Sequence, residues 1–412
     1  MNINTPDKIS ILGSFVFICS PIFDYYGYGF FSLAILLFFI LSIYILLKRG
    51  RIGFSYTWPM VCYMIYFCCA RILCNDSLRQ MIVPSIIIMF LIWGILNREL
   101  KIEQFLMCYR YVAAVCIVFF VIQELMFYVS GYKIVGVMTF LPITNIGGAD
   151  FDVSSWSDIS SQLERSSSFF SEPAQFAQFL LPLVVVEMFY VADRAAYIRV
   201  IFYLITLMLL SSGNALLGIC IIILFVALNC LKRFHPIIAS VIILLFSIVI
   251  FYSVRYIITT DYGSKLVDRQ TQIDPNQVVS SSGFVRIYRG YYIFEEMSFK
   301  ERLLGLNNNE KLNERIKSCD VAYMFGQNDM YMNAAQSILI HTGFVGCLIF
   351  ISLLINLWIG NNMAGRCCIV IFAALSFIAS IYFSYVMLLF LTTSLIMKRT
   401  NTRTNNITFF IP

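Results

Sequence analysis

Charged residues are scarce in this chain. They make up 13% of its 412 residues, roughly half the fraction that a soluble globular protein carries. Hydrophobic residues make up 60%. This composition predicts an all-α polytopic membrane protein, because an apolar helix satisfies its own backbone hydrogen bonds inside a bilayer.

Histidine is nearly absent, with only His235 and His341. No Cys/His group has the spacing of metal ligands, and no Walker loop, dinucleotide fingerprint or nucleophile elbow is found. The sequence therefore predicts no metal and no cofactor, and it argues against nucleotide-driven chemistry. Of the thirteen cysteines, only Cys74 and Cys319 are expected outside the cytoplasm, and a disulfide between them is left open.

Apolar runs of about 20 residues, the length that spans a bilayer, recur along the chain, although some are shorter. We predict twelve transmembrane helices, at residues 9–23, 29–47, 54–74, 78–96, 105–129, 169–191, 198–212, 214–231, 236–256, 334–360, 367–381 and 383–397. The last two form one uninterrupted run, so a single long tilted helix is the alternative there.

Basic residues follow every second predicted helix. They are Lys48, Arg49, Arg51, Arg98, Lys101, Arg194, Arg199, Lys232, Arg233 and Arg366, followed by Lys398, Arg399 and Arg403 in the tail. If the amino terminus is inside, all of them lie in the cytoplasm, as the positive-inside rule requires. Both termini are therefore predicted to be cytoplasmic. This topology accounts for much of the net charge of +6, so no nucleic-acid partner is needed to explain it.

Two long polar loops separate the predicted helices into three groups. The predicted organisation is helices 1–5 within residues 1–130, a first outer loop at 131–168, helices 6–9 within 169–256, a second outer loop at 257–332, helices 10–12 within 333–397, and a tail at 398–412. Loops of this length are uncommon between packed elements and are where function concentrates.

The first loop ends in the stretch RSSSFFSEPAQFAQF, which begins at Arg165. We expect Ser171 to cap the following helix and Pro173 to occupy its first turn. The free amide groups of that helix then face the loop beside Arg165, as in helix N-termini that bind phosphate. The simpler alternative is a well-capped helix with a snorkelling arginine, since Glu172 suits the helix dipole in its own right.

The second loop contains SSGFVRIYRGYYIFEEMSFKERLLGLNNNE, residues 281–310. Arg286 and Arg289 lie three residues apart and are expected on one helix face. A surface helix lying on the membrane has a similar pattern, so that alternative stays open. Within the predicted spans, we expect Arg71 and Arg110 to snorkel to the membrane surface and Glu187 to be structural.

These features, in this order, resemble the Wzy-type O-antigen polymerases of the bacterial inner membrane, in a superfamily that also holds O-antigen ligases. The resemblance covers the whole predicted topology. Its local marks are RSSSFFSEPAQFAQF, SSGFVRIYRGYYIF running to LLGLNNN, and NAAQSILIHTGFVG. They are similar to the family's arginine, aromatic and Glu-Pro motif, its Arg-containing helix with a glycine turn, and its Asn-led helix with G-x-x-G.

The resemblance implies a multi-pass inner-membrane glycosyltransferase that needs no metal and no nucleotide sugar. The donor is an undecaprenyl-diphosphate-linked oligosaccharide, and a hydroxyl of a second lipid-linked repeat unit attacks its anomeric carbon. Undecaprenyl diphosphate leaves. The implied product belongs to lipopolysaccharide or another surface polysaccharide. The implied partners are a chain-length-determining co-polymerase and a flippase.

The same resemblance suggests roles for six residues. Arginine binds a diphosphate well because its donors form a rigid fork, so Arg165 and Arg286 are assigned to catalysis, with Arg289 as a binding residue. Glu172 is assigned to activating or orienting the acceptor hydroxyl. Tyr331 and Asn333 are the remaining substrate-binding candidates.

Three other functions stay open: a ligase, a flippase or other transporter, and a purely structural membrane scaffold. In the ligases the last motif resembles a His-Asn pair, whereas Met332 precedes Asn333 here. This favours a polymerase, although Tyr331 is a candidate replacement for the histidine. The rival from another class is a lipid-linked oligosaccharide flippase or other transporter. Such proteins often contain internal repeats, which this chain does not show, and transport gives no reason for two long loops bearing arginines.

Overall fold

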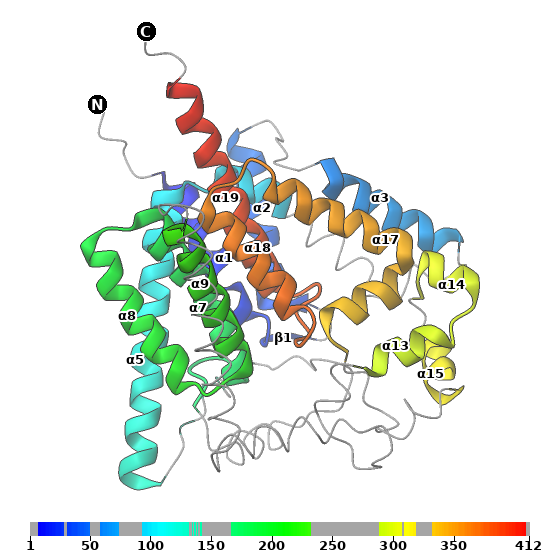
Figure 1. Cartoon of the computed structure of the whole chain (residues 1–412), viewed down its shortest axis with the longest axis horizontal. Coiled ribbons are helices and arrows are strands. Elements are labelled where there is room, and N and C mark those ends of the chain that lie inside the picture. The colour runs from blue at the N-terminus through cyan, green and yellow to red at the C-terminus, as the bar shows by residue number, and fades with distance from the viewer. Residues whose placement is uncertain are drawn as a thin grey trace. The chain divides into compact units, whose positions relative to one another are not determined.

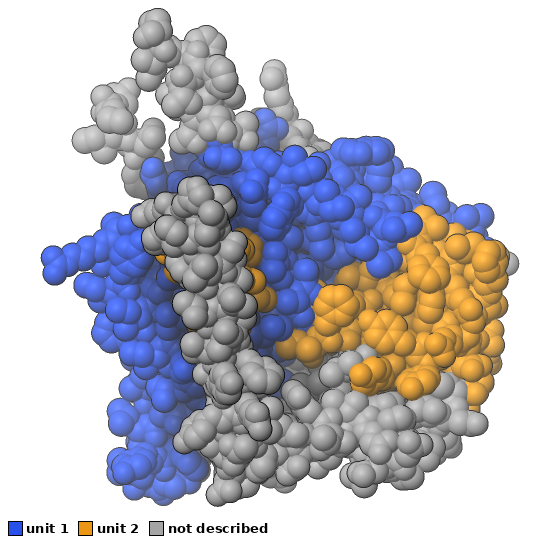
Figure 2. Space-filling model, in the orientation of Figure 1, with its two compact units in different colours: residues 1–219, 346–375, 383–412 blue, residues 220–345, 376–382 orange. Residues whose placement is uncertain are grey.

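The computed structural model describes residues 7–28, 31–49, 58–73, 93–131, 134, 136, 138, 141, 166–231, 288–306, 309–318 and 332–408. The predicted helix at 236–256, most of that at 78–96 and most of both long loops lie outside these residues. The chain forms two compact units, coloured separately in Figure 2. Unit 1 comprises residues 1–219, 346–375 and 383–412, and unit 2 comprises residues 220–345 and 376–382.

The regular elements among the described residues are helices, apart from one pair of short strands (Figure 1). The helices are α1 (Lys8–Phe23), α2 (Leu33–Arg49), α3 (Trp58–Leu73), α5 (Ile102–Ser130), α7 (Pro173–Val186) continued by the π-helix η1 (Glu187–Val191), α8 (Arg194–Leu209), α9 (Gly213–Leu231), α13 (Arg289–Glu295), α14 (Phe299–Leu304), α15 (Asn309–Ser318), α17 (Ala334–Trp358), α18 (Met363–Leu375) and α19 (Tyr385–Thr408). Among them, α5, α7 with η1, α9 and α17 are long and apolar enough to cross a bilayer. The described part of the chain therefore agrees with a helical membrane protein.

The sequence predicts a second helix from residue 29, and this boundary is wrong. Strand β1 (Gly27–Tyr28) pairs antiparallel with β2 (Phe31–Ser32), with Gly27 opposite Ser32. The N–H of Leu33 donates to the carbonyl of Tyr26 at 2.5 Å. The hairpin thus satisfies backbone groups that a longer helix would have used, and α2 begins only at Leu33.

The apolar run at 367–397 contains two helices rather than one. α18 ends at Leu375, α19 begins at Tyr385, and the two helices pack against each other. Between them Phe383 has a φ of 53°, a left-handed conformation that no α-helix contains. The chain therefore reverses direction between α18 and α19.

α7 is one of the most enclosed helices among the described residues of unit 1. It contacts α5, α8, α18 and α19, and all of its residues except Ala174 and Gln175 are buried. The hydroxyl of Tyr109 on α5 donates to the carbonyl of Phe179. A helix that is apolar on every side is expected to lie inside a bundle. This position holds the first turn of α7 against its neighbours.

Basic side chains gather at one end of the helices of unit 1. Lys101, just before α5, lies 3.7 Å from Asp7 at the start of α1. Arg399, near the end of α19, donates to the carbonyl and the side chain of Asn97 at 2.8 and 2.6 Å. The starts of α1 and α5 therefore lie near the same end as the last turns of α19.

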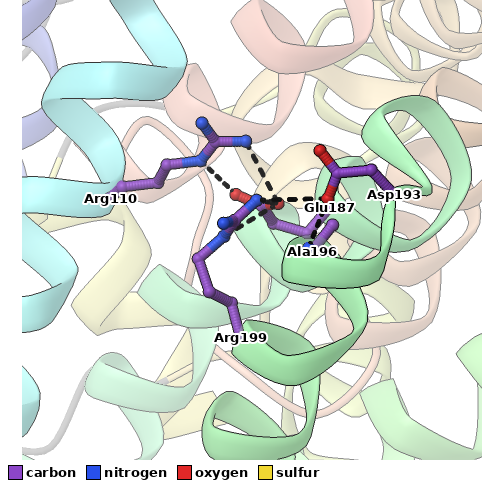
Figure 3. A network of polar contacts seen from close by, with 5 residues as sticks. All are labelled: Arg110, Glu187, Asp193, Ala196 and Arg199. Atoms are coloured by element: carbon purple, nitrogen blue, oxygen red, sulfur yellow. Dashed lines mark hydrogen bonds and ion pairs between the residues drawn. The ribbon is translucent and has the colours of Figure 1, made fainter.

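Two arginines at that end share one buried carboxylate (Figure 3). Arg110 on α5 donates through Nε and Nη2 to Glu187, and Arg199 on α8 donates through Nη2 at 2.7 Å. The Glu187 side chain is fully buried, whereas the two arginines are 34% and 30% exposed. Glu187 is structural, as expected. The prediction that Arg110 snorkels is wrong, because its guanidinium pairs with Glu187 instead.

The same correction applies to Arg71 on α3. Its side chain is buried inside unit 1, with Cζ 5.4 Å from the ring centroid of Phe67. An aromatic face attracts a guanidinium through its quadrupole. The cation is therefore held within the protein and does not reach outward along the helix surface.

Unit 2 folds part of the second loop into short helices. α13, α14 and α15 enclose an apolar cluster together with the start of α17. Its buried members are Ile293, Phe294, Met297, Leu306, Leu312, Ile316, Met332 and Ile340. α14 begins with a capping box, in which Ser298 and Glu301 each accept from the other's backbone N–H. The second loop thus contains a small packed core of its own.

Candidate functional site

The six predicted site residues divide evenly between described and undescribed parts of the chain. Arg165, Arg286 and Tyr331 lie outside the described residues. Glu172, Arg289 and Asn333 are described. Glu172 belongs to unit 1, and Arg289 and Asn333 belong to unit 2.

The turn that leads into α7 is anchored to α5. Ser168 has a φ of 56° and is fully buried. Its N–H donates to Oε1 of Gln123 at 2.8 Å, and its hydroxyl donates to the carbonyl of Cys116 at 2.7 Å. The Gln123 amide in turn donates to the carbonyl of Ile134 at 2.8 Å. One buried glutamine therefore joins the end of the first loop, its beginning and α5.

Replacing Gln123 by leucine is expected to lower the unfolding free energy by about 1–3 kcal/mol, because the buried N–H of Ser168 and the carbonyl of Ile134 lose their partner. The thermal unfolding midpoint of the purified protein in detergent measures this loss. Glu124→Gln is the matched control, since the neighbouring side chain is only half-buried. Equal midpoints for the two variants would contradict this role.

Glu172 begins α7, and the prediction that Ser171 is the cap is wrong. Glu172 has extended backbone (φ −136°, ψ 148°), and its carbonyl accepts the first helical hydrogen bonds from Gln175 and Phe176 at 3.1 and 3.3 Å. Its side chain is exposed and makes no capping hydrogen bond. The hydroxyl of Ser171 donates to Oε1 of Gln175 at 2.5 Å instead. Pro173 lies in the first turn of α7, as predicted, and is its first residue.

Tyr25, near the amino terminus of the chain, also contacts the first turn of α7. The hydroxyl of Tyr25, between α1 and β1, donates to the same Gln175 oxygen and lies 3.4 Å from the hydroxyl of Ser171. We call Tyr25, Ser171, Glu172 and Gln175 the α7 head cluster. It contains one carboxyl group, two hydroxyls and an amide at the end of unit 1 away from the basic residues.

Asp24 directly precedes Tyr25 in the sequence and was not predicted as a site residue. It follows α1 directly and is half-buried. Burial raises the pKa of Asp24 to about 6, against a smaller lowering by its hydrogen bond with Ser32. The available signal was an acid placed at the exact point where an apolar run ends, in the sequence PIFDYYGYGF. Nothing in that pattern shows that the next residue, Tyr25, contacts the first turn of α7.

Asn333 caps α17 in unit 2. Its Oδ1 accepts from the N–H of Gln336 at 2.8 Å, and Oε1 of Gln336 accepts from the N–H of Asn333 at 3.4 Å. The Asn333 amide also donates to the carbonyl of Phe377 at 2.9 Å. These bonds commit both polar atoms of the side chain to the protein itself. A role for Asn333 in binding substrate stays a prediction.

Arg289 is the first residue of α13 and is 1% exposed. The next residue, Gly290, lies so close to Gln336 that a side chain there would collide with it. The guanidinium of Arg289 is thus enclosed within unit 2 and does not lie on its surface. Its assignment to diphosphate binding stays a prediction.

The two glycine-containing motifs, LLGLNNN and NAAQSILIHTGFVG, contact each other in unit 2. α17 is kinked at Gly343 (φ 64°, ψ −174°), where a side chain would collide with the backbone of Leu303. At Gly305 (φ 83°) a side chain would collide with the backbone of His341. Nδ1 of His341 lies 3.0 Å from the carbonyl oxygen of Leu306. Backbone contacts that only glycine permits therefore hold the loop helices on α17.

The chain matches no protein-family model and no curated protein sequence. Within the described residues, no group of three or more His, Cys, Asp or Glu side chains is arranged to hold a metal ion. Cys74 and Cys319, the candidate disulfide partners, lie outside those residues. The case for a function therefore depends on the chemistry of the α7 head cluster and on the motifs around it.

Proposed function

We propose that this protein is a surface-polysaccharide polymerase of the Wzy type. It would join undecaprenyl-diphosphate-linked oligosaccharide units at the outer face of the bacterial inner membrane and release undecaprenyl diphosphate. The observation that carries the proposal is the α7 head cluster. There the Glu-Pro start of an enclosed helix presents the exposed Glu172 carboxylate beside Tyr25, Ser171 and Gln175.

The position of this cluster supports an outer active site. Lys101, Arg110, Arg199 and Arg399 gather at the opposite end of unit 1. Basic residues near the ends of membrane helices favour the cytoplasmic side. We therefore orient the basic end inward and the α7 head cluster outward. Twelve spans, two long outer loops and two cytoplasmic termini belong to this proposal.

The groups of the cluster suit an acceptor sugar. A sugar hydroxyl both donates and accepts hydrogen bonds. The exposed Glu172 carboxylate accepts hydrogen bonds, whereas the Tyr25 and Ser171 hydroxyls donate to Gln175 and hold the start of α7 in place. The cluster therefore offers a firmly positioned acceptor for a hydroxyl that must be held in one orientation before it attacks, which is a large part of what a transferase site contributes.

Arginines in the adjoining sequence suit the leaving group. Arg165 directly precedes Ser166 in the turn before α7, and Arg286 lies three residues before Arg289. Negative charge grows on the diphosphate as its bond to the anomeric carbon breaks, and fixed cations stabilise that charge. We assign this role to Arg165 and Arg286, with Arg289 in support. Tyr331 and Asn333 are proposed to bind substrate.

Deleting the gene in its native host tests the proposal. Surface lipopolysaccharide is resolved on a gel from the deletion strain and from the strain carrying the gene on a plasmid. We expect the ladder to collapse to core plus one repeat unit, because ligation and flipping continue without polymerisation. A core-only product would assign the chain to the ligase or the flippase class instead. A full-length ladder would contradict all three functions.

Glu172→Gln is expected to lower the rate of polymer formation about 10- to 100-fold, the value of a hydrogen bond to a charged group. Rates are compared in membranes with equal amounts of the protein. Glu103→Gln is the matched control, because Glu103 is also an exposed glutamate at the start of an apolar helix, α5. An undiminished rate in Glu172→Gln would remove the acceptor role from this residue.

A further inference from the structure

The two arginines that share Glu187 are not neutralised by it. Glu187 accepts from Nε and Nη2 of both Arg110 and Arg199, which leaves Nη1 of each guanidinium outside these bonds. One further acid, Asp193, lies 3.9 Å from Nη2 of Arg199, but it is mostly exposed and its Oδ1 already caps α8. Arg194 beside it is exposed as well. Among these five groups, three cations against two acids leave one positive charge.

The chain reversal between α7 and α8 builds this group. In η1 the N–H of Ala192 donates to the carbonyl of Glu187, five residues earlier, at 3.0 Å. Ala192 has a φ of 47°, and α8 begins two residues later and packs against η1. Wide π-helical turns of this kind are frequent at functional sites. The reversal brings Arg199 of α8 to Glu187, and α5 supplies Arg110 (Figure 3).

Each of these two arginines also lies where its helix becomes apolar. Residues 111–123 of α5 and residues 200–209 of α8 include no charged residue. Exposed apolar side chains along these stretches include Val115 and Val118 on α5, and Ile201, Phe202, Ile205 and Met208 on α8. An exposed apolar surface of this length suits the acyl chains of a bilayer.

Exposed tyrosines accompany the arginines. Tyr111 directly follows Arg110, Tyr197 lies two residues before Arg199, and Tyr190 lies in η1; all three side chains are exposed. Tyrosine is enriched at the membrane–water interface, because its ring suits the acyl chains and its hydroxyl suits water. The tyrosines therefore indicate that this group lies at the level of the lipid headgroups.

We propose that Arg110, Arg199 and Glu187, which we call the η1 arginine site, bind the phosphate of an anionic phospholipid in the cytoplasmic leaflet. The Nη1 donors bind phosphate oxygens, since a guanidinium fits a phosphate well. The acyl chains lie along the exposed apolar side chains of α5 and α8. Basic pockets between membrane helices on the cytoplasmic side bind acidic headgroups in this way. The site depends on the proposed orientation of the basic end and not on polymer formation.

Lipid binding to the wild-type protein is the first test. The protein purified in mild detergent is titrated with phosphatidylglycerol or with phosphatidylethanolamine of the same acyl chains, and bound lipid is counted by native mass spectrometry. We expect phosphatidylglycerol to bind about 5-fold more tightly, the effect of about one cation near an anionic headgroup. Excess inorganic phosphate should not displace it, because phosphate has no acyl chains. Displacement would indicate a site for free phosphate and would overturn the lipid assignment.

Hydrogen exchange locates the bound lipid without any variant. Phosphatidylglycerol is expected to slow exchange of the amides in residues 187–199, and phosphatidylethanolamine is not. Slower exchange confined to other parts of the chain would place the lipid elsewhere and overturn the assignment. No polymer is formed in either measurement, so a failure here is distinct from a failure of the proposed polymerase function.

Arg110→Gln and Arg199→Gln are each expected to weaken phosphatidylglycerol binding about 5-fold and to leave phosphatidylethanolamine binding unchanged. Each variant keeps one arginine on Glu187. Arg315→Gln is the matched control, because Arg315 is 36% exposed and also pairs with a glutamate, Glu301, at 3.2 Å in unit 2. It should bind both lipids like the wild type. Equal losses in all three variants, or equal wild-type affinities for the two lipids, would overturn the site.

Discussion

Replacing Glu187 by leucine is expected to lower the unfolding free energy by about 3 kcal/mol. Without its carboxylate, Arg110 and Arg199 face each other with no shared counterion (Figure 3). Breaking a buried ion pair by removing one partner costs about 3–5 kcal/mol. We expect the lower end of that range, because about a third of each arginine side chain is exposed to solvent.

The measurement is unfolding of the purified protein in mixed micelles of increasing SDS content. Asp193→Asn is the control, because Asp193 is 60% exposed and lies 3.9 Å from Arg199. Its oxygen also accepts from the N–H of Ala196 at 2.6 Å to cap α8, and asparagine keeps that cap. A loss below about 1 kcal/mol is expected for the control. Equal losses in both variants would show that Glu187 contributes nothing beyond a surface charge.

Replacing Gly343 by alanine is expected to detach the loop helices from α17. The φ and ψ of Gly343 lie in a region that is essentially restricted to glycine, and forcing another residue into it costs about 1–3 kcal/mol. An added Cβ would also lie 2.3 Å from the carbonyl oxygen of Leu303, which is backbone and cannot rotate away. Overpacking of this kind costs a further 1–3 kcal/mol or so.

Hydrogen exchange of the amides in α13, α14 and α15 measures this effect, because detachment exposes them before the whole protein unfolds. Gly360→Ala is the matched control. Gly360 also has a positive φ, 71°, but no atom lies within 4 Å of an added Cβ. It should show the cost of strain without the collision. Protection of the three helices that stays unchanged in Gly343→Ala would contradict a glycine-dependent contact.

The sequence predicted the helices of unit 1 better than it predicted their polar contacts. Apolar length and polar interruptions marked α5, α7, α17 and the pair α18 and α19. The contacts of Arg71 and Arg110 were predicted wrongly, because snorkelling assumes that a cation on a membrane helix has no closer partner than the headgroups. Glu187 and Phe67 are such partners, and nothing in the local pattern identifies them.

In the candidate site, too, the start of the helix was predicted from sequence and the side-chain contacts were not. Glu172 and Pro173 could be placed at the start of a helix from sequence, because proline at a first helical position has a local cause. The cap was assigned to Ser171, whose hydroxyl instead meets the Gln175 side chain and Tyr25. Tyr25 was missed entirely, since its partner Gln175 is distant in the chain.

By itself, the sequence determined that this is a chain of apolar helices, where most of those helices lie, and which ends carry positive charge. These three features follow from the free-energy cost of placing a charge or an unsatisfied backbone group in hydrocarbon. That cost depends on each residue by itself, so the sequence is enough to predict them. Only the tertiary structure decided that Tyr25 meets the first turn of α7, that Glu187 joins two arginines, and that Gly305 and Gly343 lie against each other's helices. A helix that is apolar on all sides has no face to indicate its neighbours, so those pairings depend on the close fit of small residues and backbone.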